Sequence, residues 1–369
     1  MTRRKLPLLL LLFAGVLLAS AAFAQEGEAT VEEYIVDGRL FLVSGECELA
    51  QYYYREALKL EPDNAEALVG NGRALACRNN YPLAIEAFQD AIEVEPENSE
   101  AYVHLALAFQ DQYLSDPERD PNRVSEALST LEVAENYSPE NPRVLNAKGV
   151  IQFQMGNLQA ARGSLEEAIA LATAQNSDLG PTERSVIHVN LGKTYRDLGE
   201  LDRARNTLRR AVVLDPRSSS AHNNLGFVHF RMGDCEEAEY ELSQAASLDP
   251  SSLSAVSQLA ITLFECGNTV GSIPHFEQAL ELNGAVFNPP LYTYLARAYA
   301  QQGRYDEAVF RAQQGALLQP QTADAYYHLG AILLQRNQDS DTEDARAAFE
   351  QALTLDPSHG SARQALSNL

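Results

Sequence analysis

Hydrophobic residues follow a helical spacing from about residue 31 to the end of the chain. They recur three or four positions apart in short segments, and most segments end at a turn marked by glycine, proline, asparagine or aspartate. Side chains at this spacing lie on one face of an α-helix. The pattern therefore predicts an all-α chain that is built from many short amphipathic helices.

A framework of small residues repeats on alternate segments. It reads Ala-x(6)-Ala-x(4)-Pro, with an aromatic residue or leucine midway between the two alanines. The full copies are Ala50/Tyr54/Ala57/Pro62, Ala84/Phe88/Ala91/Pro96, Ala127/Leu131/Ala134/Pro139, Ala204/Leu208/Ala211/Pro216, Ala238/Leu242/Ala245/Pro250 and Ala345/Phe349/Ala352/Pro357. The weaker copies are Ala161/Leu165/Ala168, Ser272/Phe276/Ala279 and Ala308/Ala312/Gly315/Pro320.

The segment before each framework carries a second pattern, large-x-x-[LIM]-[GA]-x-x-large, as in His188/Leu191/Gly192/Tyr195. Small residues let two helix backbones approach closely, and the large side chain between them fills the groove. Glycine between the two segments allows a sharp turn, and proline ends the second helix because it has no N–H to donate. The sequence thus predicts helix pairs, and these pairs must stack because no single pair can bury its apolar face alone.

This 34-residue period resembles the tetratricopeptide repeat, and the resemblance extends over nearly the whole chain after its first 30 residues. It implies a right-handed α-solenoid, a superhelix of antiparallel helix pairs with a concave groove, which ends in a capping helix at residues 360–369. Nine repeats are expected, at residues 31–64, 65–98, 99–141, 142–184, 185–218, 219–252, 253–286, 289–322 and 323–359. Extra residues interrupt the period within 112–125, 173–185 and 337–344 and at Phe287-Asn288.

The first 24 residues have the composition of a signal peptide. A basic start, MTRRK, precedes a short apolar run, and Ala22-Phe23-Ala24 forms an A-x-A-like cleavage site before Gln25. Cleavage would leave a short N-terminal segment, residues 25–30, and an exported, periplasmic protein. The alternative is an uncleaved segment that anchors the protein in the membrane, facing the periplasm, since the apolar run approaches spanning length.

The charge of the chain limits its partners. The formal net charge is -23, and removal of Arg3, Arg4 and Lys5 with the leader would bring it to -23 - 3 = -26. Such a chain repels phosphate backbones and anionic lipid, so we expect neither nucleic acid nor, after cleavage, a membrane as partner. A protein or peptide is the expected partner.

Four cysteines occur at related positions of the repeats. Cys47 and Cys235 stand at the seventeenth position of their repeats, and Cys77 and Cys266 at the thirteenth and fourteenth positions of the next repeats. In stacked repeats, the start of a second helix lies beside the end of the following first helix. We therefore predict disulfides Cys47–Cys77 and Cys235–Cys266, as suits an oxidising compartment. Four free thiols are the alternative, whereas metal ligation lacks the expected C-x-x-C spacing.

Catalytic motifs are not evident. The segment LGKTY contains Gly-Lys-Thr, but Ile187 stands where a phosphate-binding loop needs its first glycine. The His-Glu-x-x-His, Gly-x-Ser-x-Gly and glycine-rich dinucleotide motifs are missing from the sequence. We therefore expect a protein that is not an enzyme and that needs no cofactor or metal.

The resemblance implies a binding surface on the first helix of each repeat. Its positions two, five, six, nine, twelve and thirteen line the concave wall in this family. The cations and amides found there are Arg39, Arg73, Asn146, Asn190, Lys193, Arg196, Asn223, Asn224, Arg231 and Arg297. Side-chain amides both donate and accept hydrogen bonds, so they can hold an extended peptide backbone, and arginines can pair with carboxylates.

These observations favour a non-catalytic protein–protein interaction scaffold of the cell envelope that holds an extended peptide or a helix in its groove. One alternative is a structural or oligomer-forming solenoid, or a targeting subunit of an envelope assembly, secretion or polysaccharide-export machine. An enzyme with its chemistry in the insertions is a further alternative. Charge reversal of Arg196 and Arg231 separates groove binding from self-association, because only the former should weaken.

Overall fold

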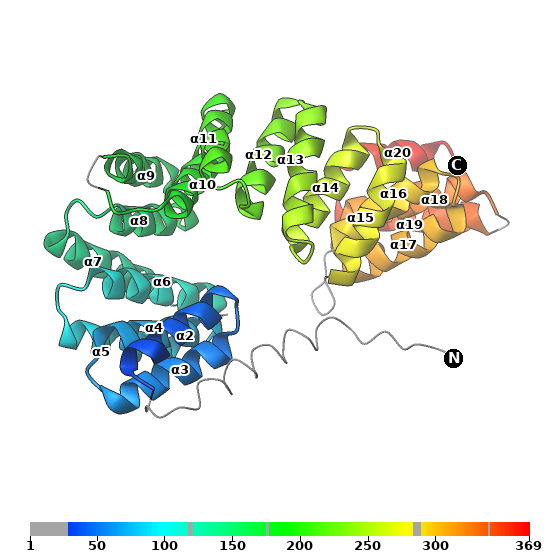
Figure 1. Ribbon diagram of the computed structural model, residues 1–369. Coiled ribbons are helices and arrows are strands. Elements are labelled where there is room, and N and C mark those ends of the chain that lie inside the picture. The colour runs from blue at the N-terminus through cyan, green and yellow to red at the C-terminus, as the bar shows by residue number, and fades with distance from the viewer. Residues whose placement is uncertain (1–28, 117–119, 121, 175–176, 283–288, 339) are drawn as a thin grey trace, which may run out of the picture. The chain divides into compact units, whose positions relative to one another are not determined.

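The computed structural model describes residues 29–116, 120, 122–174, 177–282, 289–338 and 340–369. In these ranges the chain forms helices and connecting turns without a strand, so the all-α expectation is confirmed (Figure 1). The predicted signal peptide and the extra residues Phe287-Asn288 lie outside the described residues. The chain divides into an N-terminal unit, Met1–Glu140, and a C-terminal unit, Asn141–Leu369.

The helices alternate between the first and second members of pairs, here called helix A and helix B. The A helices are α2 (Val31–Val43), α4 (Ala65–Cys77), α6 (Ser99–Ser115), α8 (Pro142–Gln154), α10 (Pro181–Asp197), α12 (Ser219–Met232), α14 (Leu253–Glu265), α16 (Pro289–Gln301) and α18 (Ala323–Arg336). The B helices are α3 (Cys47–Leu60), α5 (Tyr81–Val94), α7 (Asn122–Tyr137), α9 (Leu158–Ala172), α11 (Leu201–Leu214), α13 (Cys235–Leu248), α15 (Thr269–Leu282), α17 (Tyr305–Leu318) and α19 (Asp341–Leu355), followed by α20 (Gly360–Ser367).

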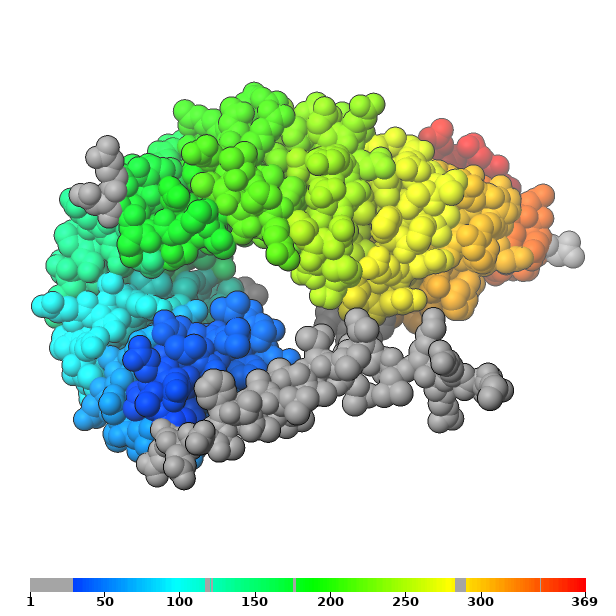
Figure 2. Space-filling model, viewed as in Figure 1, coloured from blue at the N-terminus to red at the C-terminus, as the bar shows by residue number. Residues whose placement is uncertain are grey.

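Within each of the two units, the helices pack on their neighbours in chain order. Within each unit, helix A contacts its own helix B, and helix B contacts the helix A that follows. In Figure 2 the surface colour of the C-terminal unit accordingly passes through the spectrum in sequence order. The described helices fit about nine repeats, which confirms the repeat count expected from the period.

The repeated alanines are buried where helix A meets helix B. The framework alanines, such as Ala204 and Ala211, have no exposed surface, and the leucine between them, Leu208, is equally buried. A Cβ on Gly192 of helix A would stand 2.5 Å from Cγ of Leu208. That separation is far below van der Waals contact, so this close approach requires a glycine. The small residues of the sequence pattern are therefore explained by the close contact between helix A and helix B.

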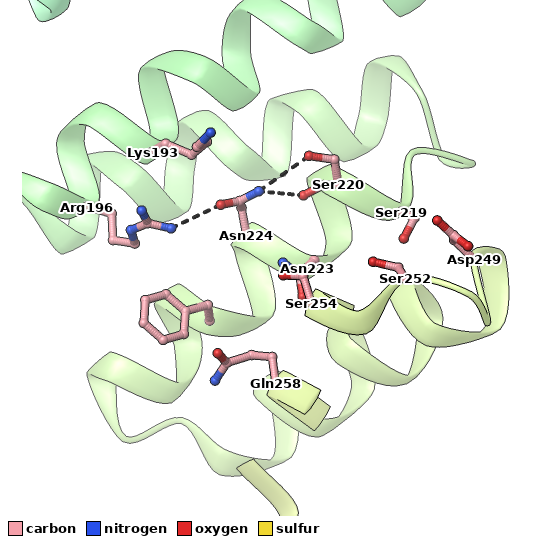
Figure 3. A pocket seen from close by; sticks show the side chains of 11 residues that line it. Lys193, Arg196, Ser219, Ser220, Asn223, Asn224, Asp249, Ser252, Ser254 and Gln258 are labelled. Carbon is pink, nitrogen blue, oxygen red and sulfur yellow. Dashed lines mark hydrogen bonds between the residues drawn. The ribbon is translucent and has the colours of Figure 1, made fainter. Parts of the chain in front are cut away.

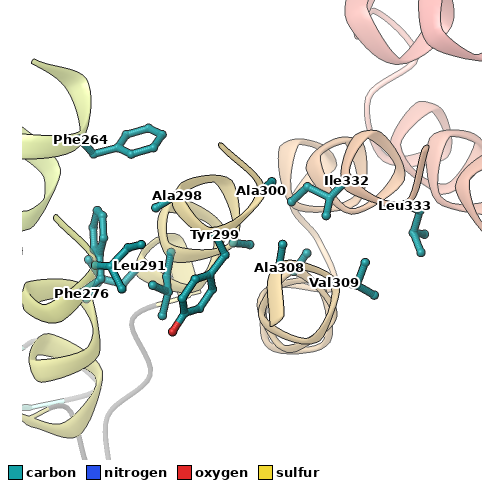
Figure 4. Packing of buried hydrophobic residues seen from close by; sticks show 14 of the residues in the cluster. Phe264, Phe276, Leu291, Ala298, Tyr299, Ala300, Ala308, Val309, Ile332 and Leu333 are labelled. Atoms are coloured by element: carbon teal, nitrogen blue, oxygen red, sulfur yellow. The ribbon is translucent and has the colours of Figure 1, made fainter. Parts of the chain in front are cut away.

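Side chains from successive helices form hydrophobic clusters in the C-terminal unit. The cluster near its end draws Phe264 from α14, Phe276 from α15 and Leu291 from α16 (Figure 4). It continues through Val309 of α17 to Ile332 of α18. Burial thus passes from each helix to the next, as expected of stacked units that cannot bury their apolar faces alone.

Among the described residues, eight of the turns between a helix A and its helix B use a residue in the left-handed conformation. Six of them are glycines, for example Gly233 with φ 85°. Asn79 and Asn337 take the same place in the second and ninth repeats, with φ 58° and 55°. Asparagine tolerates this region better than other non-glycine residues. The sequence pattern predicted the glycines at these turns but not the two asparagines.

Two insertions are partly absorbed into helices. Helix α6 continues past the usual end of a helix A to Ser115, and α10 begins at Pro181, a turn before Ser185, where the repeat was expected to start. Proline at the first turn is compatible with a helix start because its missing N–H would have no helical partner there. The Glu183 carboxylate accepts a hydrogen bond from the N–H of Gly180 at 3.2 Å, which secures the added turn.

The two predicted cysteine pairs lie at disulfide distance. Cys47, at the start of α3, is paired with Cys77, at the end of α4, and their Cα atoms are 6.0 Å apart. Cys235, at the start of α13, is paired with Cys266, which directly follows α14, at 5.9 Å. Each pair therefore joins a helix B to the helix A of the next repeat.

Candidate functional site

An open groove of about 570 Å³ lies on the C-terminal unit across three successive A helices, α10, α12 and α14. Its walls are almost entirely polar. They comprise Lys193, Arg196, Ser219, Ser220, Asn223, Asn224, Phe227, Asp249, Ser252, Ser254 and Gln258 (Figure 3). The groove therefore brings together four of the ten side chains that the sequence singled out: Lys193, Arg196, Asn223 and Asn224.

A network of hydrogen bonds fixes the Arg196 guanidinium at one end of the groove. Its Nη1 donates to Oδ1 of Asn224 at 3.1 Å, and its Nε donates to Oδ1 of Asp197 at 2.6 Å. The guanidinium also lies over the ring of Phe227, 5.2 Å from the centroid. A planar cation held in this way keeps one Nη group for a ligand and loses little freedom on binding.

The side-chain amide of Asn224 already forms hydrogen bonds with neighbouring residues. Its Nδ2 donates to the backbone carbonyl of Ser220 at 2.8 Å, while its Oδ1 accepts from Arg196. The residue is only 8% exposed. Asn190, at the same repeat position, donates from Nδ2 to Oδ1 of Asn146 at 2.9 Å. Both amides therefore position neighbouring groups, and neither one offers its full bonding capacity to a peptide backbone.

Asn223 has a buried acceptor without a hydrogen-bond donor. Its Nδ2 reaches the hydroxyl of Ser254 at 3.4 Å, which is a long contact. Its Oδ1 is buried and accepts no hydrogen bond from any described residue. A buried carbonyl oxygen without a donor is unfavourable by about 1–3 kcal/mol. Because this oxygen has almost no exposed surface, a ligand N–H would relieve the penalty only after the amide turns its oxygen toward the groove.

Lys193 brings a second cation beside Arg196. Its ammonium lies 5.4 Å from the ring centroid of Phe153, and no described carboxylate forms an ion pair with it. Burial lowers the pKa of Lys193 below its usual value, and the positive charge of Arg196 lowers it further. A carboxylate from a ligand would oppose this lowering of the pKa, because an opposite charge favours the ionised amine.

Asp249 stands at the far end of the groove from the two cations (Figure 3). Its Oδ1 accepts hydrogen bonds from the N–H and the hydroxyl of Ser251 at 3.1 and 2.7 Å. Between the charged ends lie the hydroxyls of Ser220 and Ser254 and the amide of Gln258. The groove is thus positive at one end, acidic at the other and lined by hydrogen-bonding groups in between.

The remaining predicted side chains lie elsewhere. Arg39 and Arg73 belong to the N-terminal unit, where they pair with Glu66 at 3.2 Å and Glu100 at 3.4 Å. In the C-terminal unit, Arg297 pairs with Glu265 at 3.7 Å and lies 4.8 Å from the ring centroid of Phe264. Arg231 is exposed on α12 and does not line the groove.

Sequence reasoning missed most of the uncharged wall. Ser220 and Ser254 occupy the second repeat position, Gln258 the sixth and Phe227 the ninth. All of these positions belong to the six helix A positions that were expected to line the concave wall. The repeat register alone could therefore have identified these residues. Only lysine, arginine and asparagine were considered at these positions, so serine, glutamine and phenylalanine were missed.

The described residues contain no group of three or more histidine, cysteine, aspartate or glutamate side chains that could hold a metal ion. Over the same residues, no helix has the length and hydrophobicity needed to cross a bilayer.

Comparison with known proteins places the chain among helical repeat proteins. Residues 122–367 match the family described as "Cilia and flagella-associated protein 70 C-terminal domain", and residues 37–92 and 72–112 match the family "Tetratricopeptide repeat". The Saccharomyces cerevisiae protein "Anaphase-promoting complex subunit CDC16" is 35% identical over 83 residues. This similarity covers 20% of the present chain and 9% of that relative, so the chain matches only a small part of it.

Solved structures share the fold at low identity. The "APC/C hetero-tetramer Cut9-Hcn1" matches 92% of this chain and 67% of its own, with a TM-score of 0.60 and 16% identity. The "Human IFIT1 dimer with PPP-AAAA" matches 88% and 82%, with a TM-score of 0.54 and 18% identity. Tetratricopeptide folds of this kind are typically non-catalytic scaffolds that bind proteins.

The first of these family matches covers about two thirds of the chain, and the second covers repeats nearer its start. The chain therefore belongs to the tetratricopeptide repeat proteins and, over residues 122–367, to the family of the cilia and flagella-associated protein 70 C-terminal domain.

Proposed function

We propose that this protein is an exported, non-catalytic scaffold of the cell envelope that binds an extended, acidic segment of a partner protein in the groove of α10, α12 and α14. The observation that supports this proposal best is that Lys193 and Arg196 line the same groove as Asn223, whose Oδ1 has no hydrogen-bond donor. A bound segment would place a carboxylate side chain against the two cations. Its backbone N–H would donate to Asn223.

The charge of the groove sets the direction and the chemistry of the segment. An acidic side chain belongs at the end formed by α10, and a polar or basic one belongs next to Asp249. The chain as a whole is strongly acidic, which opposes an acidic ligand at long range. That field is screened over about 8 Å at physiological salt, whereas a contact pair inside the groove is screened much less.

Export is part of the same proposal. The leader with its Ala22-Phe23-Ala24 site supports it, and so do two cysteine pairs at disulfide distance, because disulfides persist in oxidising compartments. The expected mature protein begins at Gln25 and is recovered from the periplasm. N-terminal sequencing of protein from fractionated cells tests this, and an intact Met1 in the cytosolic fraction would refute it.

Binding is tested by fluorescence anisotropy with three labelled nine-residue peptides that are acetylated and amidated. Their central residues are Asp-Glu, Asn-Gln or Lys-Arg, and the rest is glycine and serine. We expect the acidic peptide to bind most tightly. The double variant Lys193→Glu/Arg196→Glu should weaken its binding at least about tenfold.

Arg231→Glu is the matched control for this experiment. It reverses the charge of an exposed arginine on α12 that lies outside the groove, so it should change the affinity less than about twofold. Equal effects of the two charge reversals, or equal affinity for all three peptides, would refute groove recognition. Failure of even the acidic peptide to bind would refute it as well.

A further inference from the structure

A helix A packs on the preceding helix B through one face, formed by the third, sixth and tenth residues of its repeat, with the thirteenth at the exposed edge of that face. We call these residues the seam positions. In the second repeat, Cys77 at the thirteenth position is paired with Cys47 of α3, and a Cβ on Gly70 at the sixth would overlap the ring of Tyr54 of α3. In the eighth repeat, Tyr294 at the sixth position stacks on Phe276 of α15, 5.8 Å between centroids.

The first described helix, α2, leaves its seam positions exposed. Leu40, at the tenth position, is 63% exposed, and Val36, at the sixth, is 51% exposed. Val43 at the edge is 86% exposed, and the thirteenth residue is exposed in the other A helices too. The tenth residue is at most 3% exposed in the seven A helices that follow a helix B of the same unit: Ala74, Ala108, Thr194, Val228, Thr262, Ala298 and Ile332. The chain thus presents in α2 the apolar face that a helix B covers elsewhere.

At the C-terminal end of the described repeats, the last helix has a polar outer face. Helix α20 packs on α19 and α18, and it buries Ala362 while Ser361, Arg363 and Gln364 face solvent. A polar outer face of this kind is what the end of a solenoid needs for solubility. Because the C-terminal end carries no complementary apolar surface, head-to-tail contact with a second copy does not account for the face on α2.

The acidic residues of α2 favour a partner helix that carries positive charge. Glu32, Glu33 and Asp37 lie on the first two turns, and Glu33 itself occupies the third position of the repeat, a seam position. The nearby cation, Arg39, is already paired with Glu66 at 3.2 Å. A helix B runs antiparallel to the helix A that follows it, so the C-terminal half of a docked helix would meet these carboxylates. Lysine or arginine in that half would complement them.

We propose that Val36, Leu40 and Val43 bind an amphipathic helix of a partner protein, which lies antiparallel to α2 with small apolar residues toward it and basic residues in its C-terminal half. The docked helix completes the first repeat in the way that a helix B completes every seam inside the units. This surface belongs to the N-terminal unit and is separate from the groove of α10, α12 and α14, so either site can fail its test without the other.

The chain itself supplies matched probes. The α11 sequence, Leu201–Leu214, has the small-residue framework Ala204/Leu208/Ala211 and four arginines against one aspartate, two of them, Arg209 and Arg210, in its C-terminal half. The α5 sequence, Tyr81–Val94, has the same framework, but its charged residues are all acidic. Both are synthesised as lactam-stapled peptides, because isolated helices of this length are marginal in water. Binding to the full chain is measured by calorimetry.

We expect the α11 peptide to bind and the α5 peptide to bind at least about tenfold more weakly. Leu40→Glu should weaken the binding of the α11 peptide about tenfold or more. Leu317→Glu, at a leucine on α17 that is 77% exposed, should leave it unchanged, and both variants should retain the melting temperature of the wild type because both sites are solvent-exposed.

Three results would overturn the proposal. One is equal binding of the two peptides, and another is insensitivity of α11-peptide binding to Leu40→Glu. The third comes from a photo-crosslinker at position 40. Crosslinking to residues 1–28 of the same chain, or to a second copy at the working concentration in place of the α11 peptide, would show that the face already has another occupant.

Discussion

Arg196 and Asn224 are joined by a hydrogen bond of 3.1 Å from Nη1 to Oδ1, which links α10 to α12 at the charged end of the groove. Asn224 in turn donates to the carbonyl of Ser220 at 2.8 Å. The amide is held at both ends, so it fixes the direction in which the guanidinium points.

Replacement of Asn224 should therefore reduce ligand affinity without removing a ligand contact. Asn224→Ala frees Arg196 and leaves the Ser220 carbonyl without this donor, and a lost hydrogen bond to a charged group is worth about 1.5–3 kcal/mol. We expect binding of the acidic peptide to weaken about tenfold. Asn146→Ala, which breaks the Asn190–Asn146 bond at 2.9 Å outside the groove lining, is the control. Equal losses from both variants would contradict the positioning role.

A buried histidine makes the stability of the sixth repeat depend on pH. His222 contacts the Glu241 carboxylate through Nδ1 at 2.6 Å and the Pro216 carbonyl through Nε2 at 3.1 Å. Both partners are acceptors, so the ring is best satisfied when both nitrogens carry protons. The hydrogen bond to Glu241 raises the pKa of His222 above its usual value despite burial.

The sign of the pH effect follows from that shift. A pKa that is raised in the folded state gives stabilisation that is complete below the unfolded value of about 6.5 and is lost as pH rises through the folded pKa. Glu241→Gln should therefore lower the melting temperature more at pH 5.5 than at pH 9. Thermal melts at the two pH values measure this difference. Equal destabilisation at both would show that the ring is neutral throughout.

The two cysteine pairs should contribute separately to stability. They close loops with sequence separations of 30 and 31 residues, which corresponds to roughly 3–4 kcal/mol each in the chain-entropy account. Urea unfolding of Cys47→Ala/Cys77→Ala and Cys235→Ala/Cys266→Ala should each show a loss of that order. Four thiols that react with a maleimide in the native, air-exposed protein would contradict the pairing.

Two glycines offer a matched test of helix packing. A Cβ on Gly226 would stand 2.6 Å from Cγ and 3.0 Å from the backbone nitrogen of Leu242, so Gly226→Ala should destabilise the protein by about 1–3 kcal/mol through overpacking. Gly163 lies in α9 with no such neighbour within 4 Å, so Gly163→Ala should stabilise it by about 0.4–1 kcal/mol. Equilibrium unfolding in urea measures both changes, and a shift in the same direction for the two would refute the packing account.

Much of the fold could be predicted from the sequence because the same contact recurs in repeat after repeat. A glycine facing a leucine, as Gly192 faces Leu208, leaves a mark at a fixed spacing. The partner of each cysteine followed from the same register, since Cys47 and Cys77 lie where neighbouring helices meet. At these positions the residue type in the sequence matches the contact that the fold requires there.

The site was less predictable because a repeat position tells only which way a side chain faces. Asn223 and Asn224 both lie on the groove side of α12, yet Asn224 is bonded at both ends while Asn223 keeps a free oxygen. The difference depends on which neighbours come within hydrogen-bonding distance. Arg39 likewise appeared available in the sequence but is paired with Glu66.

The pairing of Cys47 with Cys77 also governs how the chain comes apart when a protease cuts it. The turn between α3 and α4 falls inside the closed loop. A nick there leaves both fragments covalently joined, and they separate only after a reductant is added. The first two repeats can therefore lose the continuity of their backbone in an oxidising medium and still remain attached to the rest of the protein.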